Sequence, residues 1–144
     1  MRGHFVLMSK QEASVVAIKE IALTSKDVPV NLKRAYYAAA EMTSAQYKIN
    51  PASKIRVFNS GKKILEEVFL SDTSDLEVRY IRYTIQKNAP AFLGYNKSIV
   101  SDKFFLIKHL SANRSIDPQL FSFVYAYLLT YGSLSQQEKA LLDQ

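Results

Sequence analysis

Residues that interrupt secondary structure are scarce in this sequence, and this scarcity limits the fold more than any other feature. Only 4 glycines and 4 prolines occur among 144 residues. Sheet proteins with many turns need such residues at frequent intervals, whereas long helices with short connections do not. Apolar residues also recur at helical spacing along most of the chain. We therefore predict one all-α domain over residues 1–144, with about seven helices in antiparallel hairpins.

Capping signals and prolines set the expected helix boundaries. Ser9, Ser74 and Ser135 each stand three residues before a glutamate, which is the spacing of a capping box. Pro51 and Pro118 cannot continue a helix but fit its first turn. The expected helices cover residues 9–24, a segment from 31 that ends before 50, 52–70, 74–88, 97–111, a segment from 118, and a short last helix from 135. Residues 1–8 are expected to be disordered.

Two features point to close helix packing. Gly61 lies in the middle of an expected helix, where glycine costs about 0.5–1 kcal/mol relative to alanine. A tight crossing with another helix would justify that cost. The helix over 74–88 is apolar on two faces, so we expect it to lie centrally.

Arg79 and Arg82 lie three residues apart at the margin between those two apolar faces. One interpretation pairs them with acidic side chains or helix carbonyl groups inside the protein. The other makes them an anion or carboxylate site beside Tyr83, because a guanidinium group binds carboxylates bidentately and stacks on aromatic rings. The sequence leaves both interpretations open.

Residues 88–96 form the one long loop, which begins at Asn88 and contains Phe92, Leu93 and Tyr95. Exposed aromatic side chains anchor protein interfaces, so the loop could be a partner-binding tip. It could equally fold over the core as a plug. Both interpretations are kept.

Two resemblances bear on the architecture. Residues 54–86 resemble a tetratricopeptide hairpin, with a small residue at Gly61 and a short polar turn, but the turn proline and a second copy are missing. The chain from Ala35 onward resembles a family of small proteins from Bacteroidetes, on the residues Glu77–Asn88, Pro90, Phe92–Tyr95 and Ser101–Lys103. The first resemblance implies a tetratricopeptide-like right-handed helical stack. The second implies no particular activity.

Residues for catalysis or metal binding do not occur in a recognisable pattern. Cysteine is absent, and the only histidines are His4 and His109. Asp102 shares a helix face with His109, but two turns separate them by about 10.5 Å, which is too far for a hydrogen bond. The glycines are isolated, so no phosphate-binding loop is present. We expect no enzyme activity, no metal and no cofactor.

The formal net charge of +6 is compatible with anionic partners. The basic residues are spread along the chain, whereas nucleic-acid-binding proteins usually gather them in one stripe, so nucleic acid is not favoured. No apolar run reaches the roughly 18 residues of a membrane span. The N-terminus has only four consecutive apolar residues, so the expected location is cytoplasmic as the sequence stands, or exported if a signal lies upstream.

These patterns together predict a non-enzymatic helical module that binds a protein or peptide. The binding groove is expected between tetratricopeptide-like hairpins, bordered by Arg79, Arg82 and residues 88–96. The alternative is an accessory protein that holds an anionic ligand at the two arginines. The candidate partner or anion-binding residues are Arg79, Arg82, Tyr83, Asn88, Phe92 and Tyr95.

Overall fold

The computed structural model describes residues 1–144 and contains only helices, which confirms the all-α prediction. Nine α-helices are joined by short connections and two 3-10 turns. The helices are α1 (Arg2–Phe5), α2 (Glu12–Thr24), α3 (Val30–Ser44), α4 (Pro51–Ser71), α5 (Leu76–Asn88), α6 (Ile99–His109), α7 (Asn113–Ile116), α8 (Pro118–Tyr131) and α9 (Gln136–Leu142). The 3-10 turns are η1 (Ala45–Tyr47) and η2 (Ala91–Leu93). The two helices beyond the expected seven are the single turns α1 and α7.

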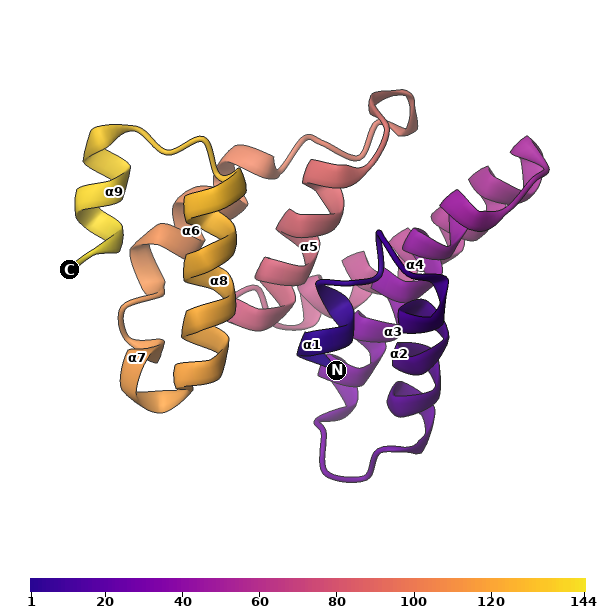
Figure 1. Cartoon of the computed structure of the whole chain (residues 1–144), viewed down its shortest axis with the longest axis horizontal. Coiled ribbons are helices and arrows are strands. Elements are labelled where there is room, and N and C mark those ends of the chain that lie inside the picture. Colours follow the sequence, from indigo (N-terminus) through magenta and orange to yellow (C-terminus); the bar gives the residue numbers. More distant parts are fainter.

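The helices form two groups that meet at α5. Figure 1 shows α1 to α4 on one side of α5 and α6 to α9 on the other. Helices α2, α3 and α4 pack in sequence order, and α5 packs against α3 and α6. Ten of the 13 residues of α5 are buried, so the prediction that this helix lies centrally is confirmed. One apolar cluster continues through both groups.

The contact between α3 and α4 depends on Gly61. A Cβ atom at this position would lie 2.6 Å from the carbonyl oxygen of Ala38 and 2.6 Å from the side chain of Met42. No real Cβ approaches a backbone oxygen so closely. The small residues of α3, Ala35, Ala38 and Ala39, are fully buried at this crossing. The tight helix crossing expected at Gly61 is confirmed.

Two of the expected helix starts are confirmed and two differ. Asp117 caps α8 by accepting a hydrogen bond from the amide of Leu120, and Ser135 forms a complete capping box with Glu138. Helix α2 begins at Glu12 without the expected cap from Ser9. Helix α5 is capped by Asp75, whose carboxylate accepts from the amide of Val78. Ser74 lies one residue before this cap, and its amide and hydroxyl donate to Asp72 instead.

The prediction that residues 1–8 are disordered is wrong. Arg2–Phe5 form a helical turn, and Phe5 and Met8 are 5% and 2% exposed. The Phe5 ring meets the rings of Tyr36 and Tyr80 edge to face, with centroids 5.6 and 5.8 Å away. Burial of these apolar side chains offsets the entropy cost of ordering the terminus. Sequence periodicity could not reveal this because the segment is too short to show a repeat.

Candidate functional site

A groove of about 690 Å³, hereafter the central groove, lies between the two helix groups. Its walls come from residues 5–10, the end of α3, the start of α4, the second half of α5, residues 88–93 and one face of α8. Sixteen of its 26 lining residues are hydrophobic. The volume is in the range of protein ligand sites, and apolar walls with a few polar groups are the usual chemistry of such sites. The groove is therefore the candidate functional site.

One face of α8 forms a wall of the central groove. Phe123, Tyr127 and Tyr131 follow one another at four-residue spacing and all line it. A second face, marked by Leu120 and Leu128, is buried in the core. The apolar run Leu120–Tyr131 predicts a buried core helix because it is too short to span a membrane. The face with Leu120 fulfils that prediction, whereas the face with Phe123 and Tyr131 borders the groove.

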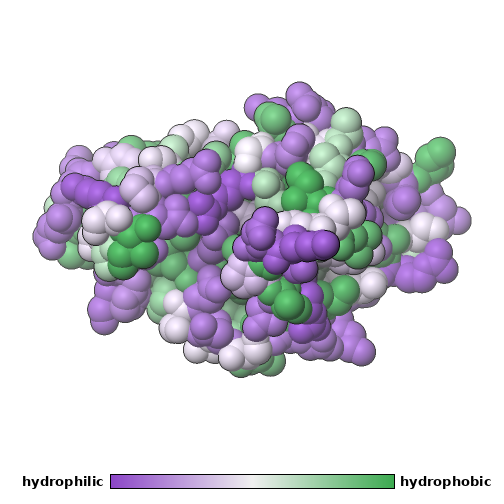
Figure 2. Space-filling model, turned by 90° about the horizontal axis from the view of Figure 1, so that it is seen from below, coloured by the Kyte–Doolittle hydropathy of each residue, from purple (hydrophilic) through white to green (hydrophobic).

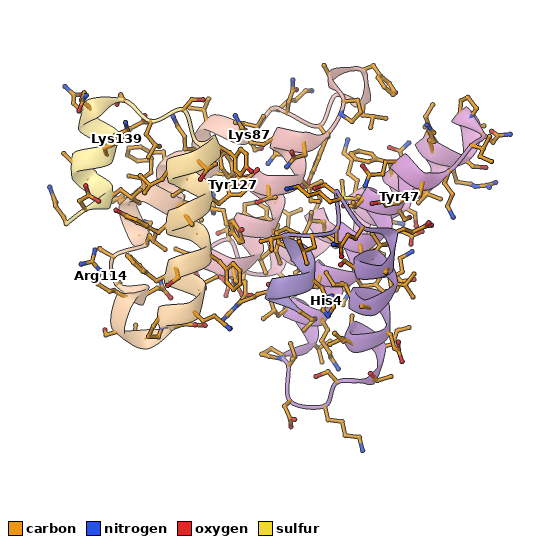
Figure 3. The ribbon with its side chains drawn as sticks, viewed as in Figure 1. His4, Tyr47, Lys87, Arg114, Tyr127 and Lys139 are labelled. Atoms are coloured by element: carbon orange, nitrogen blue, oxygen red, sulfur yellow. The ribbon has the colours of Figure 1, made fainter.

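The floor of the groove comes from α5. Tyr80, Thr84 and Asn88 recur at four-residue spacing and line the groove. Asn88 donates a hydrogen bond to the hydroxyl of Tyr127 at 3.2 Å, and Figure 3 shows Tyr127 directed from α8 toward α5. The buried hydroxyls of Tyr80 and Thr84 have no hydrogen-bond partner. Burial in this apolar wall raises the pKa of the Tyr80 hydroxyl, which therefore stays neutral.

Arg79 and Arg82 lie on the other side of α5, away from the groove. Asp102 of α6 is fully buried and accepts two hydrogen bonds from Arg82, one from Nε at 2.9 Å and one from Nη2 at 2.6 Å. It also accepts from Arg79 at 3.1 Å and from Gln86 at 2.8 Å. We call these four residues, together with Glu66, the Asp102 cluster. Its two guanidinium groups face two carboxylates, because Glu66 pairs with Arg82 at 3.2 Å.

Aromatic rings enclose the two guanidinium groups. The guanidinium carbon of Arg82 lies 3.3 Å from the ring centre of Phe69, and that of Arg79 lies 3.9 Å from the ring centre of Phe105. Burial lowers the pKa of Arg79. Burial also opposes the charge on Arg82, but hydrogen bonds and Coulomb attraction to Asp102 outweigh it and raise its pKa. Guanidinium groups stay charged at any physiological pH, so the cluster is a fixed internal ion pair.

This pairing answers the question that the sequence left open. The two arginines are 9% and 4% exposed, and their charges are matched inside the protein. Both guanidinium groups are thus already neutralised by carboxylates of the protein, and neither arginine lines the central groove. The interpretation that pairs them with internal acids is confirmed.

The two halves of the 88–96 loop agree with different interpretations. Phe92 is 79% exposed and lines the central groove, as a partner-binding tip requires. Tyr95 is buried, its ring meets Phe58 edge to face, and its hydroxyl donates to Glu66. Gly94 stands between them in the left-handed conformation, with φ of 62°, and this geometry lets the chain reverse. The second half of the loop is thus a plug, and the first half is surface.

The six sequence-predicted site residues do not come together. Asn88 and Phe92 reach the central groove, whereas Arg79, Arg82 and Tyr95 belong to the charged interior. Tyr83 is fully buried in the core and its hydroxyl lacks a partner. The residues that sequence reasoning missed are those of α8 and of the N-terminal segment. A second apolar stripe on α8, beyond the one needed for the core, was the available signal.

A second charged network fixes the N-terminal wall of the groove. Arg2 binds both carboxylate oxygens of Glu77 at 2.7 Å and contacts Asp117 at 2.6 Å. Tyr36 donates its hydroxyl proton to Glu77 as well. Hydrogen bonds from Arg2 hold the pKa of Asp117 below its usual range. The network therefore joins the first helix to the starts of α5 and α8.

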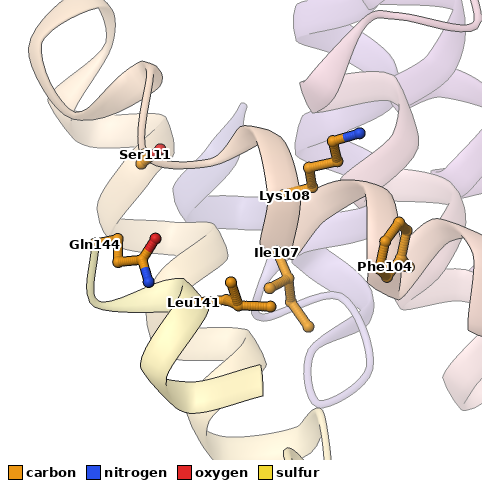
Figure 4. Close-up of a pocket in the computed structure, with 6 residues that line it drawn as sticks. All are labelled: Phe104, Ile107, Lys108, Ser111, Leu141 and Gln144. Carbon is orange, nitrogen blue, oxygen red and sulfur yellow. The ribbon is translucent and has the colours of Figure 1, made fainter. Parts of the chain in front are cut away.

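The remaining surface offers weaker candidates. A pocket of about 360 Å³ lies between α6 and α9, where Ile107 and Leu141 approach one another (Figure 4). Figure 2 shows that hydrophobic residues on the underside of the molecule form separate patches among hydrophilic ones. No group of three His, Cys, Asp or Glu side chains is arranged to hold a metal ion. No helix has the length and apolarity to cross a membrane.

Comparisons of the chain with protein-family models, with curated proteins and with solved structures find no match. The predicted resemblances to a tetratricopeptide hairpin and to a Bacteroidetes family therefore stay predictions.

Proposed function

We propose that this protein is a non-enzymatic helical module that binds a segment of another protein in the central groove. The observation that carries the proposal is the groove itself, with a volume of about 690 Å³ and walls that are mostly hydrophobic. Burial of apolar surface stabilises a complex by roughly 25 cal/mol for each Å² removed from water. An apolar groove of this size thus favours association.

The side chains in the groove suit recognition. Its walls contain the aromatic rings of Phe92, Phe123, Tyr127 and Tyr131, and aromatic residues supply much of the energy at protein interfaces. Phe92 and Tyr131 are 79% and 55% exposed, so both are free to contact a partner. Asn88 and Thr130 add hydrogen-bonding groups at the edge, which can fix the orientation of a bound segment.

The tetratricopeptide-like stack is a further part of this proposal. Helices α2, α3 and α4 pack one after another in sequence order, as successive helices of such a stack do. Stacked hairpins curve and expose a concave face on which peptides bind. In this arrangement the central groove would be that face, with α5 as its floor.

Panning a peptide-display library against the immobilised full chain tests the proposal. Ala126 is exposed on α8 and lines the groove, so Ala126→Trp fills the groove without disturbing the core. Leu129, 46% exposed on the same helix and outside the groove, provides the matched control Leu129→Trp. We expect enriched peptides to bind the original chain and Leu129→Trp but not Ala126→Trp. Enrichment of no peptide, or equal binding to all three proteins, would refute the proposal.

A further inference from the structure

The charges at the central groove are all of one sign. Lys10 and Lys54 are its only charged lining residues, and no aspartate or glutamate lines it. Both lysines are exposed, and neither takes part in an ion pair. The buried or half-buried arginines Arg2, Arg79 and Arg82 are paired with acids, so their charges are not offered to a ligand. Two unpaired positive charges beside an apolar groove complement a ligand that is apolar with negative charge at its margin.

The shape of the groove indicates a helix as its occupant. The stripe Tyr80, Thr84 and Asn88 on α5 and the stripe Phe123, Tyr127 and Tyr131 on α8 both follow four-residue ridges. Figure 1 shows that α5 and α8 run in the same direction, with α1 beside α5 on the side away from α8. Side-chain ridges at this spacing pack into the grooves of another helix. An amphipathic helix laid in such a groove presents anchors at matching intervals.

We propose that the central groove binds an amphipathic helix of a partner protein whose apolar stripe is flanked by glutamate or aspartate. This inference rests on the proposed function and adds the secondary structure and the charge of the ligand. The apolar stripe of the partner helix packs over α5, between α8 on one side and residues 5–10 with the start of α4 on the other. Its acidic side chains pair with Lys10 and Lys54.

Three labelled peptides of about 18 residues test the inference, a length at which an alanine-rich helix begins to be stable in water. They share one leucine and phenylalanine stripe and differ only in the flanking positions, which are glutamate, glutamine or lysine. Fluorescence anisotropy with the full chain measures binding. We expect the glutamate peptide to bind about tenfold tighter than the lysine peptide at low salt, because two exposed ion pairs replace two repulsions. The ratio should shrink as added salt screens the exposed lysines.

Charge reversal distinguishes the effect of Lys10 and Lys54 on peptide binding from the effect of the overall positive charge of the protein. The double variant Lys10→Glu/Lys54→Glu should invert the preference, so that the lysine peptide binds tighter. The control Lys26→Glu/Lys97→Glu changes the net charge equally at exposed positions outside the groove. It should leave the order of the three peptides unchanged. Glutamate at position 54, in the first turn of α4, is also compatible with the helix dipole.

The outcomes distinguish this inference from the proposed function. If all three peptides bind equally and Ala126→Trp abolishes binding, the groove binds peptides but the charge preference is wrong. If the two double variants change the order alike, the preference reflects net charge and the inference is again wrong. If no helical peptide binds, while displayed peptides without helical spacing do, the helical partner is excluded. If palmitate binds and no peptide does, both proposals fail.

Discussion

The two sides of helix α5 differ in how far their buried polar groups are paired. On the side toward α6, Asp102 receives four hydrogen bonds, from Arg79, Arg82 and Gln86, and only the Nε of Arg79 lacks a partner. On the side toward α8, the buried hydroxyls of Tyr80 and Thr84 lack a hydrogen-bond partner. The charged side is enclosed by protein, and the side with these hydroxyls borders the central groove.

This difference separates a charged structural region from the surface of the proposed binding groove. A buried charge is tolerated only when it is paired, so the Asp102 cluster must be complete for α5 and α6 to pack. An unpaired buried hydroxyl costs about 1–3 kcal/mol. We therefore expect substitutions on the charged side of α5 to lower stability more than substitutions on the groove side.

The largest expected effect comes from breaking the closed side. Asp102→Asn leaves two buried guanidinium groups with only Glu66 as a counter-charge, and the free energy of unfolding should fall by about 3–5 kcal/mol. Urea denaturation followed by circular dichroism measures this change. The exposed Asp27 provides the control Asp27→Asn, which should stay within about 0.5 kcal/mol of the original chain. A loss below about 1 kcal/mol for Asp102→Asn would contradict the structural role.

A smaller loss should follow when the N-terminal wall of the groove is released. Arg2→Gln removes the bidentate contact to Glu77, and we expect the free energy of unfolding to fall by about 2 kcal/mol. Hydrogen exchange at residues 2–10 should become faster because the segment detaches. Unchanged exchange in this segment would show that Phe5 and Met8 alone hold it.

The same variant should change the pH dependence of stability. Contact with Arg2 lowers the pKa of Asp117 in the folded protein, so its contribution is present above the ordinary carboxyl range. The contribution is lost as the pH falls through the lowered pKa. Arg2→Gln should therefore flatten the acid side of the stability curve, measured by urea denaturation between about pH 2 and 6. If the variant loses stability with falling pH as steeply as the original chain, the pairing of Arg2 with Asp117 is not the cause.

A matched pair of tyrosine substitutions compares the two sides directly. Tyr95→Phe, at the closed side, removes the hydroxyl that donates to Glu66 but keeps the ring against Phe58. We expect a loss of about 1–2 kcal/mol in the free energy of unfolding, since the acceptor is charged and only partly exposed. A neutral result would mean that solvent replaces the hydroxyl at no cost.

The smallest effect is expected at the groove. Tyr80→Phe removes an unpartnered hydroxyl, so the free energy of unfolding should stay the same or rise by up to about 1 kcal/mol. Thermal unfolding of both tyrosine variants under the same conditions gives the comparison. If Tyr80→Phe destabilised the protein more than Tyr95→Phe, the assignment of the two sides would have to be reversed.

Several parts of the fold could be predicted because they depend on near neighbours. The helix starts at Asp117 and Ser135 follow from residues three positions away, and the central place of α5 follows from its two apolar faces. The close helix crossing at Gly61 could be predicted because glycine destabilises the middle of a helix unless close packing requires it. The predicted cap at Ser74 was wrong for a local reason too, since the amide and the hydroxyl of Ser74 donate to the nearby Asp72.

Patterns between near neighbours were enough to predict the helical class, most helix boundaries and two arginines that need acidic partners. Which acids pair with the arginines depends on the folded arrangement, because Arg82 and Asp102 lie 20 residues apart and Arg2 and Glu77 lie 75 apart. The central groove depends on it as well, because its lining comes from five separate parts of the chain. Helix periodicity and capping act over a few residues, whereas charge pairing and concave surfaces arise from segments that meet only on folding.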